Sequence, residues 1–137
     1  MHEIAQILTQ AKAQNWPYPK TFQALKHIGV ESYVVSLLEG IDAIYQGSFG
    51  VWIEAVPSDY ISQGFDVDGS FYPSEVQAAI LKHTQKKTSY LEFLRDIAAS
   101  GVASYIVDMQ AATVTYFNID KTQSYQEIVP IWEAIDR

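Results

Sequence analysis

The chain contains no cysteine in its 137 residues. This absence excludes disulfide scaffolds, thiolate zinc sites, iron–sulfur clusters and cysteine nucleophiles. Basic residues are also scarce, because nine Lys and Arg stand against 16 Asp and Glu and give a formal net charge of −7. Such a balance disfavours electrostatic binding to nucleic acid or to anionic membranes. We therefore expect neither as a partner.

Long apolar runs are missing as well. No stretch approaches the roughly 18 consecutive apolar residues of a membrane-spanning helix, so the sequence predicts none. Residues 1–4 place an acid where a secretory leader carries basic residues, and we expect a cytoplasmic protein. What the chain does have is 48% hydrophobic residues. That is enough to build one packed core, and we expect residues 1–137 to form a single domain.

An internal repeat organises the sequence. Sliding the chain by 72 positions aligns residues 1–36 with residues 73–108 without a gap, and seven of the 36 pairs are identical. Five of the seven fall in the cluster Gly-Val-x-Ser-Tyr-x-Val, which occurs at 29–35 and again at 101–107. Such self-similarity indicates a duplicated structural unit.

Each repeat begins with two amphipathic helices. In the first repeat, apolar or small residues recur at i, i+3, i+4 and i+7, counted from Ile4. In the second repeat the same spacing starts at Val76, and its last position is His83. Ser89 and Glu92 are predicted to form a capping box at the start of the second helix of the second repeat.

A glycine, Gly29 or Gly101, follows the second helix of each repeat and is predicted to close it. β-Branched and aromatic residues come next, which favours strands. The expected strands are 31–38, 42–46 and 51–56 in the first repeat, and 103–109, 113–117 and 125–129 in the second.

These elements predict an α+β fold, in which two helix-helix-meander units share an antiparallel sheet covered by helices on one face. The units are residues 1–56 and 73–129, and a loop at 57–72 joins them. A last short helix is predicted over 131–137.

The joining loop contains Phe65-Asp66-Val67-Asp68-Gly69-Ser70. Its two acids match the local pattern of aspartyl-nucleophile phosphatases, but the buried parallel strand that this chemistry needs is missing before them. The third ligand of a calcium loop is missing too. We therefore interpret the stretch as an acidic surface turn.

Two residues break the symmetry of the repeat. His83 stands where the first copy has Ala11, and Asp108 stands where it has Ser36. His83 is either a hydrogen-bonded residue at the edge of the core or a ligand contact. No third group completes a catalytic triad, so we predict no catalytic residue.

A basic cluster follows the same helix. Lys82 and Lys86, with Lys87, stand where the helix dipole favours cations, or where an anion could bind. The second half is also less acidic than the first, with a net charge of −2 against −5. We expect any small polar or anionic ligand there, with candidate contacts at His83, Tyr90, Asp108, Lys82 and Lys86. The three histidines have no paired i, i+4 spacing, so no metal site and no cofactor are predicted.

Tyrosines recur on the expected strands. Core packing explains them, although their apolar rings and polar ends also suit an interface or a pocket. They are Tyr33, Tyr45, Tyr105 and Tyr116.

The second repeat also carries a family resemblance. The run from His83 to Tyr90, followed by Phe93, Ala99-Ser100-Gly101-Val102, Val107-Asp108-Met109 and Thr115-Tyr116, resembles the YbcV-like family of small bacterial and prophage proteins, some labelled phage envelope proteins. The resemblance runs from Phe22 to Pro130. It implies an α+β fold, no established enzyme activity, and motif positions at His83, Tyr90 and Asp108. Relatives carry cysteines that this chain lacks, so their thiol chemistry does not apply here.

Taken alone, the sequence favours a non-catalytic binding or interaction protein that forms a homodimer. Two alternatives stay open. One is a small enzyme or ligand sensor with a pocket around His83 and Asp108, and the other is an acidic inhibitor or antitoxin-like protein.

Overall fold

The structure is a computed structural model that describes residues 3–38, 42–55, 65–85 and 88–130. Within this part, helices and strands follow one another in the same order in each half. The first half comprises α1 (Glu3–Ala13), α2 (Tyr18–His27), β1 (Val30–Ser36), β2 (Asp42–Gly47) and β3 (Gly50–Ala55). The second comprises α3 (Pro73–Thr84), α4 (Tyr90–Ala99), β4 (Ser104–Asp108), β5 (Thr113–Phe117) and β6 (Ser124–Ile128).

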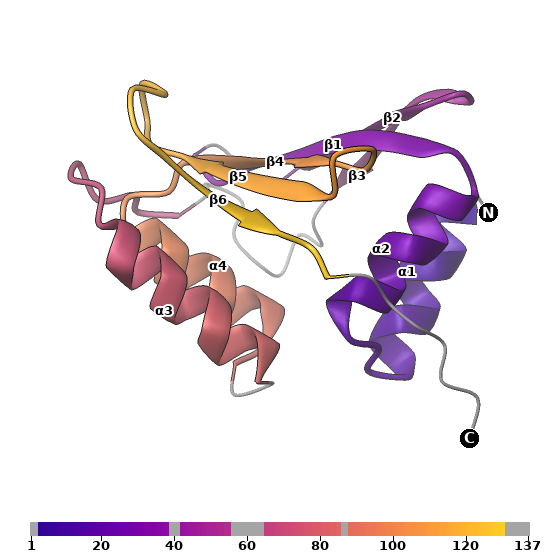
Figure 1. The fold of residues 1–137 in the computed structure, drawn as a ribbon, viewed down its shortest axis with the longest axis horizontal. Helices are drawn as coiled ribbons and strands as arrows, with labels where there is room; N and C mark the ends of the chain where they lie inside the picture. The colour runs from indigo at the N-terminus through magenta and orange to yellow at the C-terminus, as the bar shows by residue number, and fades with distance from the viewer. Residues whose placement is uncertain (1–2, 39–41, 56–64, 86–87, 131–137) are drawn as a thin grey trace.

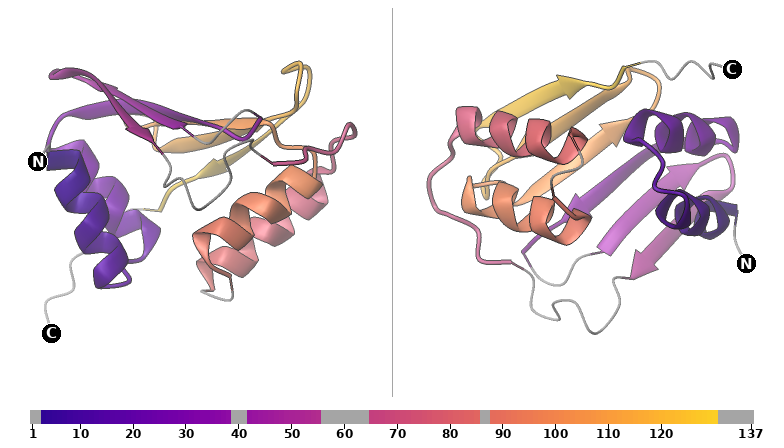
Figure 2. Two further views of the ribbon diagram at one scale, coloured as in Figure 1. Left: turned by 180° about the vertical axis from the view of Figure 1, so that it is seen from behind. Right: turned by 90° about the horizontal axis from the view of Figure 1, so that it is seen from below.

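All strands join one antiparallel sheet with the order β3-β2-β1-β4-β5-β6. The helices cover one face of this sheet in two pairs, α1 with α2 and α3 with α4, and leave the other face open (Figures 1 and 2). The predicted α+β fold is therefore confirmed. The duplication itself stays a prediction, which the matching element order supports.

The two halves meet at the centre of the sheet. Strands β1 and β4 pair from Ser32 opposite Asp108 to Ser36 opposite Ser104. Beyond the end of β1, Leu37 is fully buried. Its N–H donates to the Ala103 carbonyl, and its own carbonyl accepts from the Phe65 N–H. This hydrogen bonding explains why the regular strand ends two residues before the predicted boundary.

Local sequence sets the helix ends as expected. The Ser89 hydroxyl accepts from the Glu92 N–H at 3.1 Å and the Glu92 carboxylate accepts from the Ser89 N–H at 3.0 Å, so the predicted capping box is confirmed. Gly29 and Gly101 follow α2 and α4 with φ of 100° and 96°, a region that L-residues with a side chain rarely adopt. The helix predicted over 131–137 lies outside the described residues.

The core fills the space between the helices and the sheet. Because alternate strand residues point to opposite faces, one side chain in two along each central strand is buried under the helices. The largest fully buried side chains are Ile4, Leu25, Leu37, Leu94, Ile97, Met109, Val35, Val76, Val102 and Val107.

The two helix-closing glycines make a matched test of this packing. Alanine at either position costs roughly 1–2 kcal/mol for the positive φ. In Gly101→Ala the new Cβ also lies 2.1 Å from the Ser70 carbonyl oxygen and 2.8 Å from Phe71 Cα, whereas in Gly29→Ala it meets the rotatable Ser48 hydroxyl at 2.7 Å. Urea unfolding should therefore show Gly101→Ala losing about 1–3 kcal/mol more than Gly29→Ala. Equal losses would contradict the close approach of the segment before α3.

Candidate functional site

Two matching groups of polar side chains lie on the helix-covered face of the sheet. We call them the tyrosine–glutamate clusters. The first consists of Tyr18, Tyr33, Tyr45 and Glu54, from α2, β1, β2 and β3. The second consists of Tyr90, Tyr105, Tyr116 and Glu127, from α4, β4, β5 and β6.

In the first cluster the polar groups are joined in pairs. The hydroxyls of Tyr18 and Tyr33 lie 2.5 Å apart. The ring of Tyr33 stacks on that of Tyr45, with centroids 4.7 Å apart, and Tyr45 donates a hydrogen bond to Glu54. Helix α2 is thus hydrogen-bonded to the sheet through side chains alone at this point.

The second cluster repeats this arrangement. The hydroxyls of Tyr90 and Tyr105 lie 2.7 Å apart, and Tyr116 donates to the Glu127 carboxylate at 2.7 Å. The rings of Tyr105 and Tyr116 are tilted by 43° with centroids 5.5 Å apart. Each half therefore contributes two bonded phenols and one phenol–carboxylate pair.

The fold brings the two clusters together. Tyr33 pairs across β1 and β4 with Val107, and Tyr105 pairs with Val35, so the two tyrosines are diagonal neighbours, roughly 7–8 Å apart. Tyr18 and Tyr90 begin α2 and α4, and these first turns point toward the midline between the helix pairs (Figure 2). The phenol oxygen of Tyr90 is near enough to Tyr18 and Tyr33 to affect the pKa of both groups.

Burial controls the protonation of these groups. It raises the pKa of Tyr18, Tyr33, Tyr45, Tyr105 and Tyr116 above the usual phenol value. Tyr90 is 45% exposed as a whole, yet burial around its hydroxyl raises the pKa to about 12. Burial also raises the pKa of Glu54 and of Glu127, and the hydrogen bond from the neighbouring tyrosine opposes this shift.

These protonation states define what the clusters can do. Neutral phenols donate one proton each, and carboxylates only accept. In each pair of tyrosine hydroxyls, one hydroxyl donates its proton to the oxygen of the other. The proton of the accepting hydroxyl is then free to be donated to a ligand. The raised pKa of the phenols disfavours a tyrosinate nucleophile or base. The arrangement offers a polar ligand both phenol donors and carboxylate acceptors.

The structure places His83 in the last turn of α3, beside α4. Its ring stacks on Phe93 with centroids 4.6 Å apart, and Nδ1 lies 3.1 Å from the Thr88 carbonyl oxygen. Because a carbonyl accepts only, the ring proton sits on Nδ1. The ring of Tyr90 lies 6.4 Å from the ring of His83 and 6.4 Å from that of Phe93, measured between centroids. His83 and Tyr90, two of the predicted contacts, are thus brought together, and both join α3 to α4.

Asp108 has different surroundings. Its carboxylate is exposed and accepts from the N–H groups of Gln110 and Ala111, both at 3.0 Å, which stabilises the turn after β4. It also lines a groove of about 460 Å³, with Lys26, Gly29, Val30, Glu31, Ser48, Met109 and Gln110. Its neighbours in this groove come from the end of α2, the start of β1 and the turn between β2 and β3, whereas the contacts described for His83 are with Thr88, Tyr90 and Phe93. Whether either residue binds a ligand stays a prediction.

The other motifs are surface features in the described chain. Lys82 lies in the last turn of α3, whereas Lys86 lies outside the described residues. Asp66 and Asp68 are both exposed, and Asp68 accepts from the Ser70 N–H at 2.8 Å, as expected of an acidic surface turn. Among the residues that the structure describes, no group of three or more His, Asp or Glu could hold a metal ion. No helix in this part of the chain is long and apolar enough to cross a membrane.

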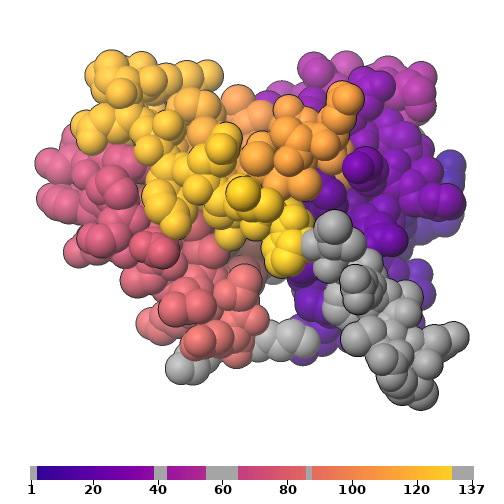
Figure 3. Space-filling view, viewed as in Figure 1, coloured from indigo at the N-terminus to yellow at the C-terminus, as the bar shows by residue number. Residues whose placement is uncertain are grey.

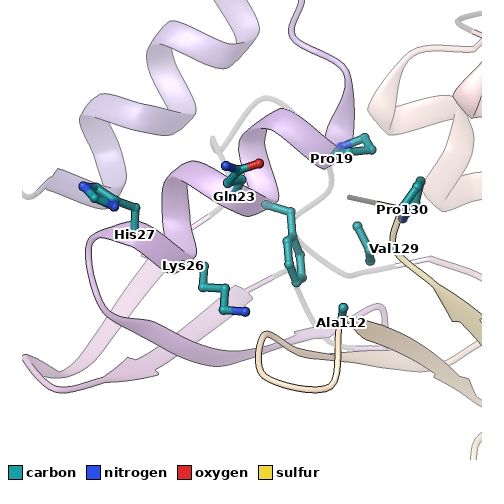
Figure 4. Close-up of a pocket in the computed structure, with 8 residues that line it drawn as sticks. Pro19, Gln23, Lys26, His27, Ala112, Val129 and Pro130 are labelled. Atoms are coloured by element: carbon teal, nitrogen blue, oxygen red, sulfur yellow. The ribbon is translucent and has the colours of Figure 1, made fainter. Parts of the chain in front are cut away.

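A second hollow, of about 410 Å³, lies between α2 and the end of β6 (Figure 4). Phe22 and Val129 are its buried lining residues, and Pro130, the last described residue, also lines it. The remaining lining residues are Pro19, Gln23, Lys26, His27 and Ala112.

Sequence reasoning found the four strand tyrosines but missed Tyr18, Glu54 and Glu127. Tyr18 and Tyr90 are an identical pair at the 72-residue offset, which was an available signal. Glu54 and Glu127 are 73 residues apart, beyond the end of the gapless alignment. An alignment of the two repeats that allowed the 72-residue offset to change by one residue between strands would have matched these two glutamates.

The surroundings of His83 predict a dependence of stability on pH. Burial lowers the pKa of His83 from 6.5, and the hydrogen bond to Thr88 opposes this shift. The unfolded chain then binds the proton more tightly, so the free energy of unfolding should fall as the pH drops below about 6.5. His83→Asn keeps an N–H donor toward Thr88 and does not titrate. Its unfolding free energy should change less between about pH 7.5 and 5.5 than that of the native chain.

Urea unfolding at several pH values makes this measurement, with His27→Asn at an exposed site of α2 as the control. Identical pH profiles for the native chain and His83→Asn would show that His83 is not the group responsible.

Comparison with known proteins gives a family but no described activity. Among curated proteins no relative of the chain is found. The model of a family described as proteins of unknown function (DUF1398) matches residues 6–128, which spans both helix pairs and all the strands of the sheet. The chain belongs to this family.

Proposed function

We propose that this chain is a non-catalytic binding protein, that each tyrosine–glutamate cluster forms a binding site on the covered face of the sheet, and that the ligand is a small organic cation such as an amine with an apolar body. The observation that carries the proposal is the pairing of two half-buried carboxylates, Glu54 and Glu127, with buried tyrosines on one face of the sheet.

The two carboxylates of the clusters favour a cationic ligand. A buried carboxylate costs free energy unless it is paired, and here each has a neutral phenol as its partner in place of a cation. An ammonium group would supply the missing positive charge and restore the ordinary pKa of the carboxyl. The net charge of −7 also favours the approach of cations to the molecule.

The aromatic rings near Glu54 favour a cation that carries an apolar group or is a quaternary ammonium. Tyr33 and Tyr45 are stacked, and the ring of Trp52 lies 5.7 Å from that of Tyr45. Rings of this kind attract cations through their faces and add apolar contact area. Such a ligand differs from the small polar or anionic ligand that the sequence predicts near Lys82 and His83, which stays an alternative at the α3–α4 end.

The proposal also keeps the finer assignments made from sequence. The motif from His83 to Asp108 supports a YbcV-like protein of bacterial or prophage origin, and the absence of cysteine is compatible with a cytoplasmic location.

Three ligands of matched size test the charge preference: phenethylammonium, 2-phenylethanol and phenylacetate. Isothermal titration calorimetry should detect binding of the amine and much weaker binding of the other two. Glu54→Gln and Glu127→Gln should each weaken amine binding about tenfold or more at the cluster that contains the substitution, because a hydrogen bond to a charged group is lost there. Affinity should also fall as the pH drops through the raised pKa of the two carboxyls.

Glu75→Gln removes the same charge at an exposed position in the first turn of α3 and serves as the control. The proposal fails if phenylacetate binds as well as the amine, or if Glu75→Gln weakens binding as much as Glu54→Gln.

A further inference from the structure

The face of the sheet that the helices leave uncovered has an unusual composition. We call this surface the open face (Figure 1). On each strand, the residues that alternate with the buried ones point toward it. Its aliphatic members include Val34, Ile44, Val51, Ile53 and Ile106.

The aliphatic side chains form a continuous row. Strand pairing puts Ile53 opposite Ile44, Ile44 opposite Val34, and Val34 opposite Ile106, across β3, β2, β1 and β4. Ile53 is 58% exposed, Ile44 38% and Val34 36%. The next position along the row is Thr115, which is uncharged. Apolar side chains are normal singly on a surface, whereas a contiguous row of them marks an interaction site.

Charge is nearly missing from this face. Among strand residues whose side chains are described, the exposed charged ones away from the helices are Asp108 at the end of β4 and Glu31 in the irregular start of β1, both at the margin of the face. The described residues between these two are aliphatic, aromatic, Ser, Thr, Gln or Gly, in a chain with 18% charged residues. Depletion of charge at the centre of a patch is what distinguishes a protein interface from ordinary surface.

We propose that the open face is a homodimer interface, where a second copy of this chain packs sheet against sheet. The row is uncharged along its length, so no partner of opposite charge is required and the same surface can face itself across a two-fold axis. Isologous contacts of this kind are the commonest in oligomers. Packed sheets lie about 10 Å apart, with β-branched side chains between them.

The available area agrees with a dimer of moderate affinity. Six strands spaced about 4.8 Å apart, each about 17 Å long, give a face of about 500 Å². Two such faces bury about 1,000 Å², which is near the lower limit for a specific interface. The dimer should therefore form reversibly with concentration. This inference is independent of the proposed cation site, because the clusters lie on the opposite face of the same sheet.

Sedimentation equilibrium of the full chain over a range of micromolar concentrations tests the interface. The native chain should show a monomer–dimer equilibrium. Ile44→Lys, at the centre of the row, and Ile53→Lys, on the edge strand, should each weaken dimerisation at least tenfold. Leu81→Lys places the same charge at a 57% exposed site on α3 and should leave the equilibrium unchanged.

Thermal melts and circular dichroism confirm that each variant is folded, and Ile53 is exposed enough for its substitution to be tolerated. A native chain that stays monomeric at all concentrations overturns the proposal. A dimer that survives both Ile44→Lys and Ile53→Lys also overturns it, because another surface must then hold the copies together.

Discussion

The burial of six phenol hydroxyls and two carboxyls beneath one sheet is the constraint on which the rest of this structure depends. Each buried polar group must find a partner, or it costs about 1–3 kcal/mol. The partner of Tyr33 lies on α2 and the partner of Tyr105 on α4, so these hydrogen bonds fix each helix pair over its half of the sheet. Leu or Phe would fill the same space without this requirement, which is why we assign the network a role in binding.

The two faces of the sheet consequently differ in their chemistry and in the partners that they suit. The covered face carries polar groups that are paired within the chain, and the open face carries aliphatic side chains with little covering them. A ligand on the covered face would contact the cluster of one half, whereas a second copy on the open face would contact all six strands, with the aliphatic row on β3, β2, β1 and β4 as the apolar part of the interface. Binding and association can therefore vary separately, although both act on the same central pair of strands.

Most of the fold could be predicted from the sequence because its signals are local. The period of the apolar residues, the Ser89–Glu92 capping box and the glycines at 29 and 101 each determine structure within a few residues. The clusters could be predicted only in part. Tyr18 and Tyr33 are 15 residues apart, and nothing in the spacing shows that a helix start and a strand will bring two hydroxyls together. His83 drew attention by breaking the repeat, yet the structure gives it contacts that join two helices.

The most direct test of the account is a pH titration of the tyrosine Cζ carbons by NMR, with each resonance assigned through a Tyr→Phe variant. The account predicts that the six cluster tyrosines keep the shift of a neutral phenol well above pH 10, that Tyr90 ionises first with a pKa of about 12, and that the others ionise only as the chain unfolds. Ionisation of Tyr33 or Tyr105 near pH 10 in the folded protein would contradict it, since those hydroxyls would then lie in water.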